Sequence, residues 1–325
     1  MVSKIRLTLK KIAGTKILCL GDLMLDRYVY GQATRLSPEA PVPIVQVRRQ
    51  THVPGGLGNV VMNLSSLGAW PLAAGLTGCD PAAEILAELL QGALDHCSPP
   101  LVRDPTRPTT IKTRVIAGIQ QVVRFDEESE TPLDSKVGAL YREAVSTALG
   151  SVSAVAVSDY GKGVITPSFC RWLIKKTEKL SLPVVFDPKG DDYSRYRGAA
   201  LVTPNRQELA AAAGRDIARA QPEVLISAGL ELMNRHGLKN LLITRSEEGM
   251  TLVSPPDSVR HLPARAKEVF DVSGAGDTVV AAVAACLGAN LTLEEGAELA
   301  TAAAGVVVGK VGTAVATPQE ILNSL

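Results

Sequence analysis

Aromatic side chains are scarce in this chain, and neither sign of charge dominates it. Phe, Trp and Tyr together make up 4% of the 325 residues, and the formal net charge is +1. Proteins that stack nucleic-acid bases need aromatic rings, and proteins that bind nucleic acid or an anionic membrane present a basic surface. The composition therefore predicts neither nucleic acid nor a membrane as a partner.

Cysteine and histidine are also few, and their spacing follows no metal or redox motif. The five cysteines are spread over the whole length, at Cys19, Cys79, Cys97, Cys170 and Cys286, and the four histidines are equally scattered. This pattern predicts no disulfide framework and no zinc site. We expect reduced thiols in a cytoplasmic protein.

Long apolar runs are absent as well. The longest, Val279–Leu291, is rich in Ala and too short to cross a bilayer, so it fits a buried helix. The N-terminal segment has no long apolar stretch before the acid at Asp22, which is unlike a signal peptide. With 46% hydrophobic and 21% charged residues, the composition is that of a globular protein.

Three common sequence motifs of nucleotide or hydrolase sites are missing. Neither a GxGxxG dinucleotide fingerprint nor a G-x-S-x-G elbow occurs. The segment Gly305–Thr313 is not a Walker A loop, because only three residues separate its glycines and Val311 replaces Ser or Thr. These absences argue against an NAD-type oxidoreductase, a serine hydrolase and a P-loop enzyme.

Short apolar runs alternate with helix-like segments, which predicts βαβ units around a mostly parallel sheet. The expected strands are Lys16–Asp22, Ala73–Gly78, Ala154–Tyr160, Pro183–Lys189, Ala200–Asn205 and Asn240–Ser246. Five of them end in polar side chains, at Asp22, Asp159, Asp187, Asn205 and Thr244. Ligands of open α/β sheets bind outside the carboxyl ends of the strands, so we expect an active-site rim there.

Two regions break this alternation. Residues 27–53 and 109–126 carry strand-like patterning, the first around a Pro-rich turn at Ser37–Pro43 and the second around a turn near Gly118. We expect four short strands that lie outside the main sheet and form a small β lid over the strand ends.

The stretch Asp271–Val283 begins DVSGAGD and carries the clearest chemical pattern. Gly274, Ala275 and Gly276 are small enough to let backbone N–H groups converge on an anion at the start of a helix. Asp277 would lie beside that anion and could take a proton from an attacking hydroxyl. The alternative is a Gly-rich turn in which Asp277 is an ordinary N-cap.

Two further segments offer ligand-binding groups. In PGGLGN, Gly55 and Gly56 allow close backbone approach and Asn59 can donate to or accept from a hydroxyl; the alternative is a loop that simply enters a helix. Asn205 and Glu208 form an N-x-x-E unit after a strand, which could orient hydrated Mg²⁺ and the phosphates it carries. The alternative for this pair is a capping box.

Together these motifs resemble the ribokinase (PfkB-type) carbohydrate kinases. The shared features are GD after the first strand, PGG-x-GN, N-x-x-E and D-x-x-GAGD, in this order along nearly the whole chain. Within that family the most similar group is the D-glycero-β-D-manno-heptose 7-phosphate kinases. The segments that carry this closer resemblance are Gly21–Gly31, Ser37–Val45, Ser158–Gly163, Phe186–Gly190, Thr203–Glu208 and Gly305–Thr313. Leu57 departs from the pattern, since a small residue is commoner there.

The resemblance implies a doubly wound α/β sandwich whose β lid forms a homodimer interface. It implies ATP and Mg²⁺ as cofactors, and phosphorylation of the anomeric hydroxyl of heptose 7-phosphate on the route to ADP-heptose and lipopolysaccharide. Many relatives carry a C-terminal nucleotidylyltransferase domain with an H-x-G-H motif. That motif is absent here, so we expect a single kinase domain over residues 1–325.

The resemblance also assigns site residues. Asp277 is the expected base, beside the anion nest of Gly274, Ala275 and Gly276. The expected cofactor-binding residues are Asn205, Arg206, Gln207, Glu208, Thr244, Ser246 and Gly249, with Asn205 and Glu208 reaching Mg²⁺ through water. The residues expected to hold sugar hydroxyls are Asp22, Asp26, Gly55, Gly56 and Asn59.

The phosphate already on the sugar needs cations away from the reacting hydroxyl. The candidates are Arg114, Arg124, Lys162 and Lys189, with the two lysines preferred; the alternative is that all are ordinary solvated charges. Two other functions fit the same motifs: a kinase of this type for another sugar or a nucleoside, and a non-catalytic sensor of sugar or nucleotide.

Overall fold

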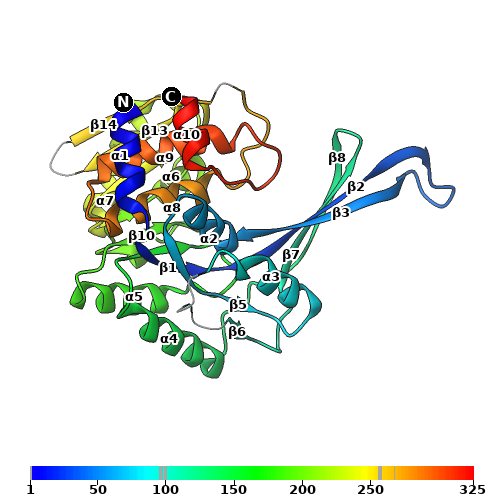
Figure 1. Ribbon diagram of the computed structural model, residues 1–325, viewed down its shortest axis with the longest axis horizontal. Helices are drawn as coiled ribbons and strands as arrows, with labels where there is room; N and C mark the ends of the chain where they lie inside the picture. Colours follow the sequence, from blue (N-terminus) through cyan, green and yellow to red (C-terminus); the bar gives the residue numbers. More distant parts are fainter. Residues whose placement is uncertain (1, 95–97, 99–100, 255–257, 267) are drawn as a thin grey trace.

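Eight strands form the central sheet of the computed structural model, which describes residues 2–94, 98, 101–254, 258–266 and 268–325 (Figure 1). Their order is β14-β13-β12-β11-β10-β9-β1-β4. The strands are β1 (Lys16–Gly21), β4 (Trp70–Ala74), β9 (Ala154–Ser158), β10 (Val184–Asp187), β11 (Leu201–Val202), β12 (Leu241–Thr244), β13 (Met250–Ser254) and β14 (Ser258–Leu262). Neighbours from β4 to β12 are parallel, whereas β13 pairs antiparallel with both β12 and β14.

The side chains of the central strands face two separate cores. On β1, Ile17 and Cys19 belong to one core, and Leu18 and Leu20 belong to the other; all four are fully buried. A parallel sheet buried on both faces needs helices on both sides. The first core is lined by α1 (Val2–Ile12), α2 (Leu57–Ser66), α3 (Pro81–Gln91), α8 (Ala275–Gly288), α9 (Leu293–Val307) and α10 (Pro318–Ser324). The second is lined by α4 (Ser135–Leu149), α5 (Pro167–Lys179), α6 (Arg206–Ala213) and α7 (Pro222–His236).

The six strands predicted for the main sheet are present, and one of them is displaced. β4 begins at Trp70, before the expected start at Ala73. The end of the expected segment forms the short β5 (Leu76–Thr77), which pairs with β6 (Val102–Arg103) outside the main sheet. The antiparallel pair β13 and β14 was not predicted. Two short 3₁₀ helices, η1 (Tyr193–Tyr196) and η2 (Ser246–Glu248), follow β10 and β12.

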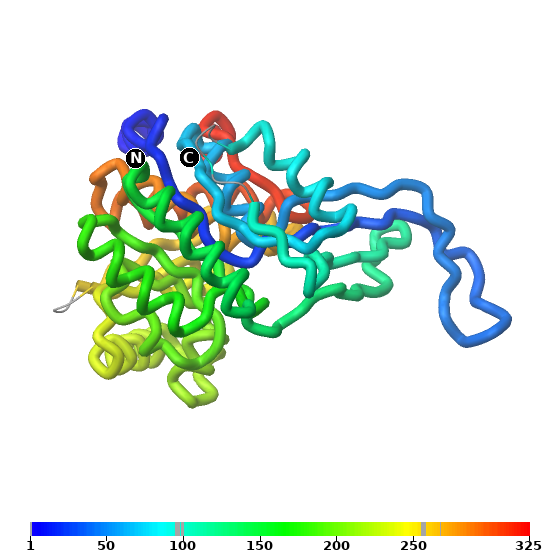
Figure 2. Tube along the Cα trace, turned by 90° about the horizontal axis from the view of Figure 1, so that it is seen from below, coloured from blue at the N-terminus to red at the C-terminus, as the bar shows by residue number. Residues whose placement is uncertain are grey.

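The predicted lid is confirmed as a separate four-stranded sheet in the order β3-β2-β7-β8. Its strands are β2 (Leu23–Leu36), β3 (Pro43–Gly56), β7 (Thr110–Ala117) and β8 (Gln120–Glu127). The expectation of short strands is wrong for β2 and β3, which have 14 residues each. They form an arm that projects from the body of the protein, and the turn between them bends away at the tip (Figures 1 and 2).

The lid joins the body without a linker. Asp22 alone separates β1 from β2, and β3 passes directly into α2 at Leu57. Within the described residues, no helix combines the length and apolar character that crossing a membrane requires. Three of the described cysteines are buried and Cys79 is exposed, all of them free, while Cys97 lies outside the described residues.

Candidate active site

The polar strand ends lie along one edge of the parallel sheet, as expected from the sequence. β9 ends at Ser158, β10 at Asp187 and β12 at Thr244. Asn205, which follows β11, forms a backbone bridge with Thr244. Asp159 has a structural role instead: its carboxylate pairs with Arg195 and accepts a hydrogen bond from the backbone N–H of the next turn.

Asp277 lies inside the first turn of α8, because the N-cap of this helix is Gly274. The alternative that Asp277 is the N-cap is therefore wrong. Its side chain is 1% exposed. Asn59 Nδ2 donates to Oδ2 at 2.9 Å, and the Ser158 hydroxyl donates to Oδ1 at 3.2 Å. The Tyr160 hydroxyl lies 3.3 Å from Oδ1 and 3.2 Å from Oδ2.

Burial raises the pKa of Asp277 to about 7, and the negative charge of Asp26 adds to the rise. The hydrogen bonds from Asn59, Ser158 and Tyr160 stabilise the carboxylate and oppose it. A general base works best when its pKa lies near the working pH. The surroundings of Asp277 thus suit it to accept a proton at neutral pH.

Gly274 holds the loop before α8 in a conformation that other residues rarely adopt. Its φ is +79°, and a Cβ there would lie 2.4 Å from Asn59 Nδ2. The Ala275 N–H donates to a backbone carbonyl of the preceding turn. The N–H groups of Gly276 and Asp277 find no backbone acceptor in the described part of the chain. The first N–H groups of a helix attract anions. Of the predicted anion-binding loop, the N–H groups that remain able to bind an anion are therefore those of Gly276 and Asp277.

Two carboxyl groups beside this helix have no cation within ion-pairing distance in the described residues. Asp187 accepts a hydrogen bond from Thr203 at 3.3 Å, and burial raises its pKa well above its usual range. The charges of Glu208 and Asp277 add to that rise. Burial also raises the pKa of Glu208. The charge of Lys189 opposes both rises. Two neighbouring carboxyl groups without a direct ion pair fit a site for a hydrated divalent cation.

Asn205 and Glu208 form the capping box of α6. Asn205 Oδ1 accepts from the Glu208 N–H at 2.9 Å, and Glu208 Oε2 accepts from the Asn205 N–H at 3.0 Å. Glu208 Oε1 remains for a ligand. No cluster of three or more His, Cys, Asp or Glu side chains suited to a metal occurs among the described residues. A cation here would complete its shell with water and phosphate oxygens, as Mg²⁺ usually does.

The residues expected around the nucleotide differ in their freedom to bind it. The Arg206 guanidinium donates to the carbonyls of Ala218 and Ala220 and pairs with Glu248, so it fastens α6 to neighbouring segments. Gln207 and Ser246 are exposed, and Thr244 is half-buried. Gly249 approaches the backbone of residues 262–264 so closely that a Cβ would clash with it.

The lid base holds two of the expected sugar-binding residues in one cluster. The carboxylate of Asp26 pairs with Arg114 and accepts a hydrogen bond from the Thr313 hydroxyl at 3.1 Å. Gly55 lies against the same carboxylate. Thr313 also contacts the Tyr28 hydroxyl, so the lid is joined to the C-terminal loop.

Asp22 anchors the turn that follows β9. Its side chain is 2% exposed, and Oδ2 accepts from the N–H groups of Tyr160 at 2.8 Å and Lys162 at 3.1 Å. Oδ1 is buried and has no hydrogen-bond partner among the described residues. Oδ2 of Asp22 therefore accepts hydrogen bonds from the protein backbone, and Oδ1 could accept one from a ligand.

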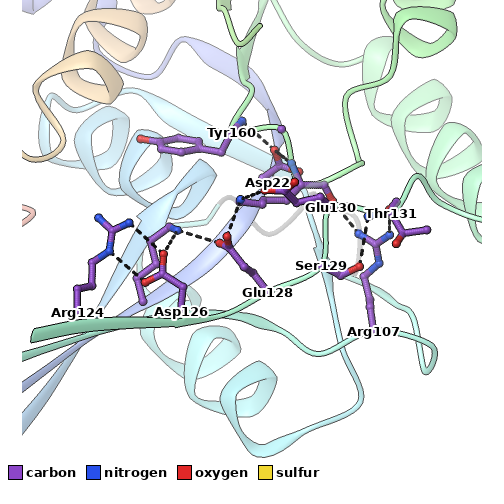
Figure 3. A network of polar contacts seen from close by, with 12 residues as sticks. Asp22, Arg107, Arg124, Asp126, Glu128, Ser129, Glu130, Thr131 and Tyr160 are labelled. Atoms are coloured by element: carbon purple, nitrogen blue, oxygen red, sulfur yellow. Dashed lines mark hydrogen bonds and ion pairs between the residues drawn. The ribbon is translucent and has the colours of Figure 1, made fainter.

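Three of the four candidate phosphate-binding cations are already ion-paired, and Figure 3 shows the pair of Arg124 with Asp126. The Lys162 ammonium lies 2.7 Å from Glu128 and 2.9 Å from Glu130, and Arg124 pairs with Asp126. Lys189 is exposed, and no ion pair of its ammonium occurs among the described residues. The structure thus does not combine Lys162 and Lys189 into one unpaired cationic site.

Sequence reasoning assigned no role in the site to Ser158, Tyr160 or Thr313, and gave Asp187 only a place on the active-site rim. Asp187 was visible as a polar strand end, and Ser158 and Tyr160 belong to the SDYGKG segment used for the resemblance. Their contacts with Asp277, 119 and 117 residues away, have no local pattern. Only the fold reveals them.

The site has the parts of a phosphoryl-transfer enzyme, and comparison with known proteins gives its family. Residues 14–320 match the family described as pfkB family carbohydrate kinase. The chain belongs to the pfkB family of carbohydrate kinases. It is an ATP-dependent sugar kinase with a ribokinase-like fold.

The pfkB-family chain is also similar to curated proteins over nearly its whole length. It is 45% identical over 318 residues to the bifunctional protein HldE of Paramagnetospirillum magneticum, covering 97% of this chain and 64% of that protein. It is 44% identical over 321 residues to HldE of Klebsiella pneumoniae, covering 98% of this chain and 65% of that protein. The chain thus spans just under two thirds of the length of these relatives.

Solved structures share the fold of this pfkB-family kinase. Arabidopsis thaliana ribokinase complexed with ribose and ATP superimposes with a TM-score of 0.73 at 19% identity, over 96% of this chain and 98% of the other. Phosphofructokinase-2 from Escherichia coli in complex with fructose-6-phosphate gives 0.74 at 20% identity, over 96% and 97%. The predicted ribokinase-like sandwich is therefore confirmed.

Proposed function

We propose that this pfkB-family kinase transfers the γ-phosphoryl group of ATP to the anomeric hydroxyl of D-glycero-β-D-manno-heptose 7-phosphate. The observation that carries the chemistry is Asp277, a buried carboxyl with a pKa of about 7 at the N-terminus of α8. The sugar is supported by the segments that resemble heptose 7-phosphate kinases. A non-catalytic sensor would need no base of this kind.

In the proposed reaction, Asp277 accepts the proton of the anomeric hydroxyl as its oxygen attacks the γ-phosphorus and ADP leaves. The open N–H groups of Gly276 and Asp277 stabilise the charge on the transferred group. Mg²⁺, when bound, neutralises charge on the ATP phosphates. Asn205 and Glu208 would hold it through water, beside the carboxyl of Asp187.

The other proposed roles come from the resemblance to the family. Thr244, Ser246 and Gly249 would line the nucleotide. Asp22, Asp26, Gly55, Gly56 and Asn59 would surround the sugar hydroxyls. Lys189 is the preferred contact for the 7-phosphate, because Lys162 is neutralised by two glutamates. We further propose a cytoplasmic homodimer that associates through the lid and supplies the 1,7-bisphosphate for ADP-heptose synthesis.

Phosphorus NMR of a reaction containing heptose 7-phosphate, ATP and Mg²⁺ tests the proposal. The expected product shows a second sugar phosphate on the anomeric carbon while ADP accumulates in equal amount. Free heptose, hexose phosphates and nucleosides are tested in parallel as alternative phosphoryl acceptors. Higher catalytic efficiency on another acceptor would assign a different sugar or nucleoside kinase. Equal kcat/KM values for free heptose and heptose 7-phosphate would contradict the proposed binding site for the 7-phosphate.

A further inference from the structure

Three hydrogen-bond donors surround the carboxylate of Asp277. Ser158 donates to Oδ1, Asn59 donates to Oδ2, and the Tyr160 hydroxyl lies within 3.3 Å of both oxygens. A carboxylate offers roughly four lone-pair sites, and these three groups supply three protons, so one site remains for a further donor. A sugar hydroxyl must also reach hydrogen-bond distance before a base can take its proton. The orientation of the Tyr160 hydroxyl, which lies near both oxygens, decides which of them carries the open site.

Tyr160 is the donor that can give up its contact with one oxygen of Asp277 and still donate to the other. Its two contacts, at 3.3 and 3.2 Å, share one hydroxyl, so it can give up either of them and keep the other. Asn59 is fixed more firmly, since its Nδ2 also lies 3.3 Å from the Gly274 carbonyl and its Oδ1 accepts from Asn63 at 3.1 Å. Ser158 is fully buried at the end of β9.

We propose that Tyr160 is a positioning residue of the kinase reaction. Its hydroxyl holds the Asp277 carboxylate in orientation through one oxygen and reserves the other oxygen for the acceptor hydroxyl of the sugar. This inference rests on the proposed role of Asp277 as the base. It adds a residue that fixes where the acceptor hydroxyl binds.

The turn that carries Tyr160 is held at several points. The Tyr160 N–H donates to the buried carboxylate of Asp22, and so does the N–H of Lys162. The Lys162 ammonium continues the chain of contacts to Glu128, directly after lid strand β8 (Figure 3). Tyr160 is therefore placed by the body and by the lid together.

The charges around Asp277 keep Tyr160 a donor. Asp26 on β2 and Asp187 at the end of β10 add negative charge near the site. Burial, together with Asp277 and Asp187, raises the pKa of the Tyr160 phenol well above its ordinary value. The phenol therefore stays protonated through the neutral range, and its proton is available to one oxygen of Asp277 or the other.

The test is the substitution Tyr160→Phe, which keeps the ring and removes the hydroxyl. The first measurement is the carbon-13 titration of the Asp277 carboxyl without substrates, assigned by its loss in Asp277→Asn. Losing a hydrogen bond to a charged group should raise the pKa of Asp277 by about one unit. The acidic limb of the kcat profile should move by the same amount. At pH 7 this leaves about a tenth of the enzyme with ionised Asp277, instead of about half, and lowers kcat about fivefold.

Tyr141→Phe is the matched control. It also removes a buried tyrosine hydroxyl, here one that donates to the Ala74 carbonyl at 2.9 Å and makes no hydrogen bond to Asp277 among the described residues. It should change neither the titration nor the profile. If Tyr160→Phe does not fold, 3-fluorotyrosine at position 160 replaces it. That phenol is a stronger donor and should lower the pKa of Asp277.

The outcomes separate this inference from the proposed function. An Asp277 titration and a kcat profile that both stay at their wild-type positions in folded Tyr160→Phe, or in the fluorinated protein, would overturn the role of Tyr160. Failure of the wild type to phosphorylate heptose 7-phosphate would instead remove the proposed function. The substrate-free titration would still decide whether Tyr160 controls Asp277.

Discussion

Asp277 is held by donors from two distant parts of the chain, Asn59 on α2 and the Ser158–Tyr160 segment at the end of β9. Burial alone would favour its protonated form, and the three donors favour its carboxylate. The balance of these two effects gives a group that titrates near neutral pH. A more exposed aspartate would be ionised at every working pH but would be a weaker base.

The substitution Asp277→Asn preserves the shape of this side chain and removes the base. Turnover should fall by roughly 100-fold or more, the usual scale for the loss of a general base. The affinity for ATP should change little, and calorimetry measures it separately from kcat. Asp134→Asn at the N-cap of α4 is a control, because that aspartate only caps its helix. Near-normal turnover in folded Asp277→Asn would refute the assignment.

Asp277 should also make stability depend on pH. Its pKa is about 7 in the folded protein and about 3.9 in an unfolded chain, so between these values the folded state binds more protons. Its contribution to the free energy of unfolding is therefore present below about pH 4 and is lost as the pH rises to about 7. Asp277→Asn should gain stability relative to wild type over this range, measured by urea unfolding. A stability difference that does not change with pH would contradict the raised pKa.

Lys189 and Lys162 should respond differently to truncation. Loss of a charge-assisted contact costs about 1.5–3 kcal/mol, so Lys189→Ala should raise the KM for heptose 7-phosphate about tenfold or more. Unphosphorylated heptose should be affected far less. Lys162→Ala breaks two ion pairs near the lid base and should affect both sugars alike. The measurement is the ratio of the kcat/KM values for heptose 7-phosphate and unphosphorylated heptose in each variant. If only Lys162→Ala loses the preference for the phosphorylated sugar, Lys162 and not Lys189 contacts the 7-phosphate.

At the scale of helices and strands, local patterns were enough to predict most of the central sheet. β1, β9, β10 and β12 are buried apolar runs that end at polar residues or glycine, and such runs are visible without a structure. β14 was missed because its side chains are mostly exposed and it has no clean alternation. The lid pairing was predicted only in outline, since β2 pairs with β7 across a long stretch of sequence.

The candidate site was predictable where its residues are close in sequence. Gly274, Gly276 and Asp277 lie within one turn, and Asn205 and Glu208 within another. The pairing of Lys162 with Glu128 was not predictable, because the two residues are 34 positions apart and meet only when the lid is folded. Ion pairs of this kind depend on tertiary structure, so a count of cations overestimates the number free to bind phosphate.

Glu208 in the first turn of α6 caps the helix, and we propose that it also holds Mg²⁺; one substitution can separate the two roles. Glu208→Gln retains an oxygen for the Asn205 N–H, so the capping box should persist while the charge is lost. The Mg²⁺ concentration for half-maximal rate should rise, with little change in the KM of the sugar. Glu295→Gln is a matched control, because it makes the same change in the capping box of α9. A Mg²⁺ titration that coincides with wild type would exclude Glu208 from the metal site.

The whole molecule presents apolar side chains on its projecting lid. Val123 and Phe125 on β8 are 47% and 48% exposed, and they lie opposite Val115 and Thr113 of β7 on one face of the sheet. Exposed apolar surface of this kind favours association, and a two-fold dimer would bury it. The double variant Val123→Asp and Phe125→Asp should therefore be monomeric by sedimentation velocity. Val259→Asp on β14 is the control. A dimer that survives the double substitution would place the interface elsewhere.

Because the lid joins the body without a linker, a small rotation at its base would move its tip a long way. With 14 residues at about 3.3 Å each, β2 and β3 are each about 45 Å long. A rotation of about 10° at Asp22 would displace the tip of the arm by about 8 Å, while Gly55, which pairs with Met24 near its base, would move by only about 1 Å. Large opening at the tip is thus compatible with an almost stationary sugar-binding floor. A partner that contacts residues 36–43 would therefore transmit a large movement at the tip as a small movement near Gly55, in a ratio set by the strand length.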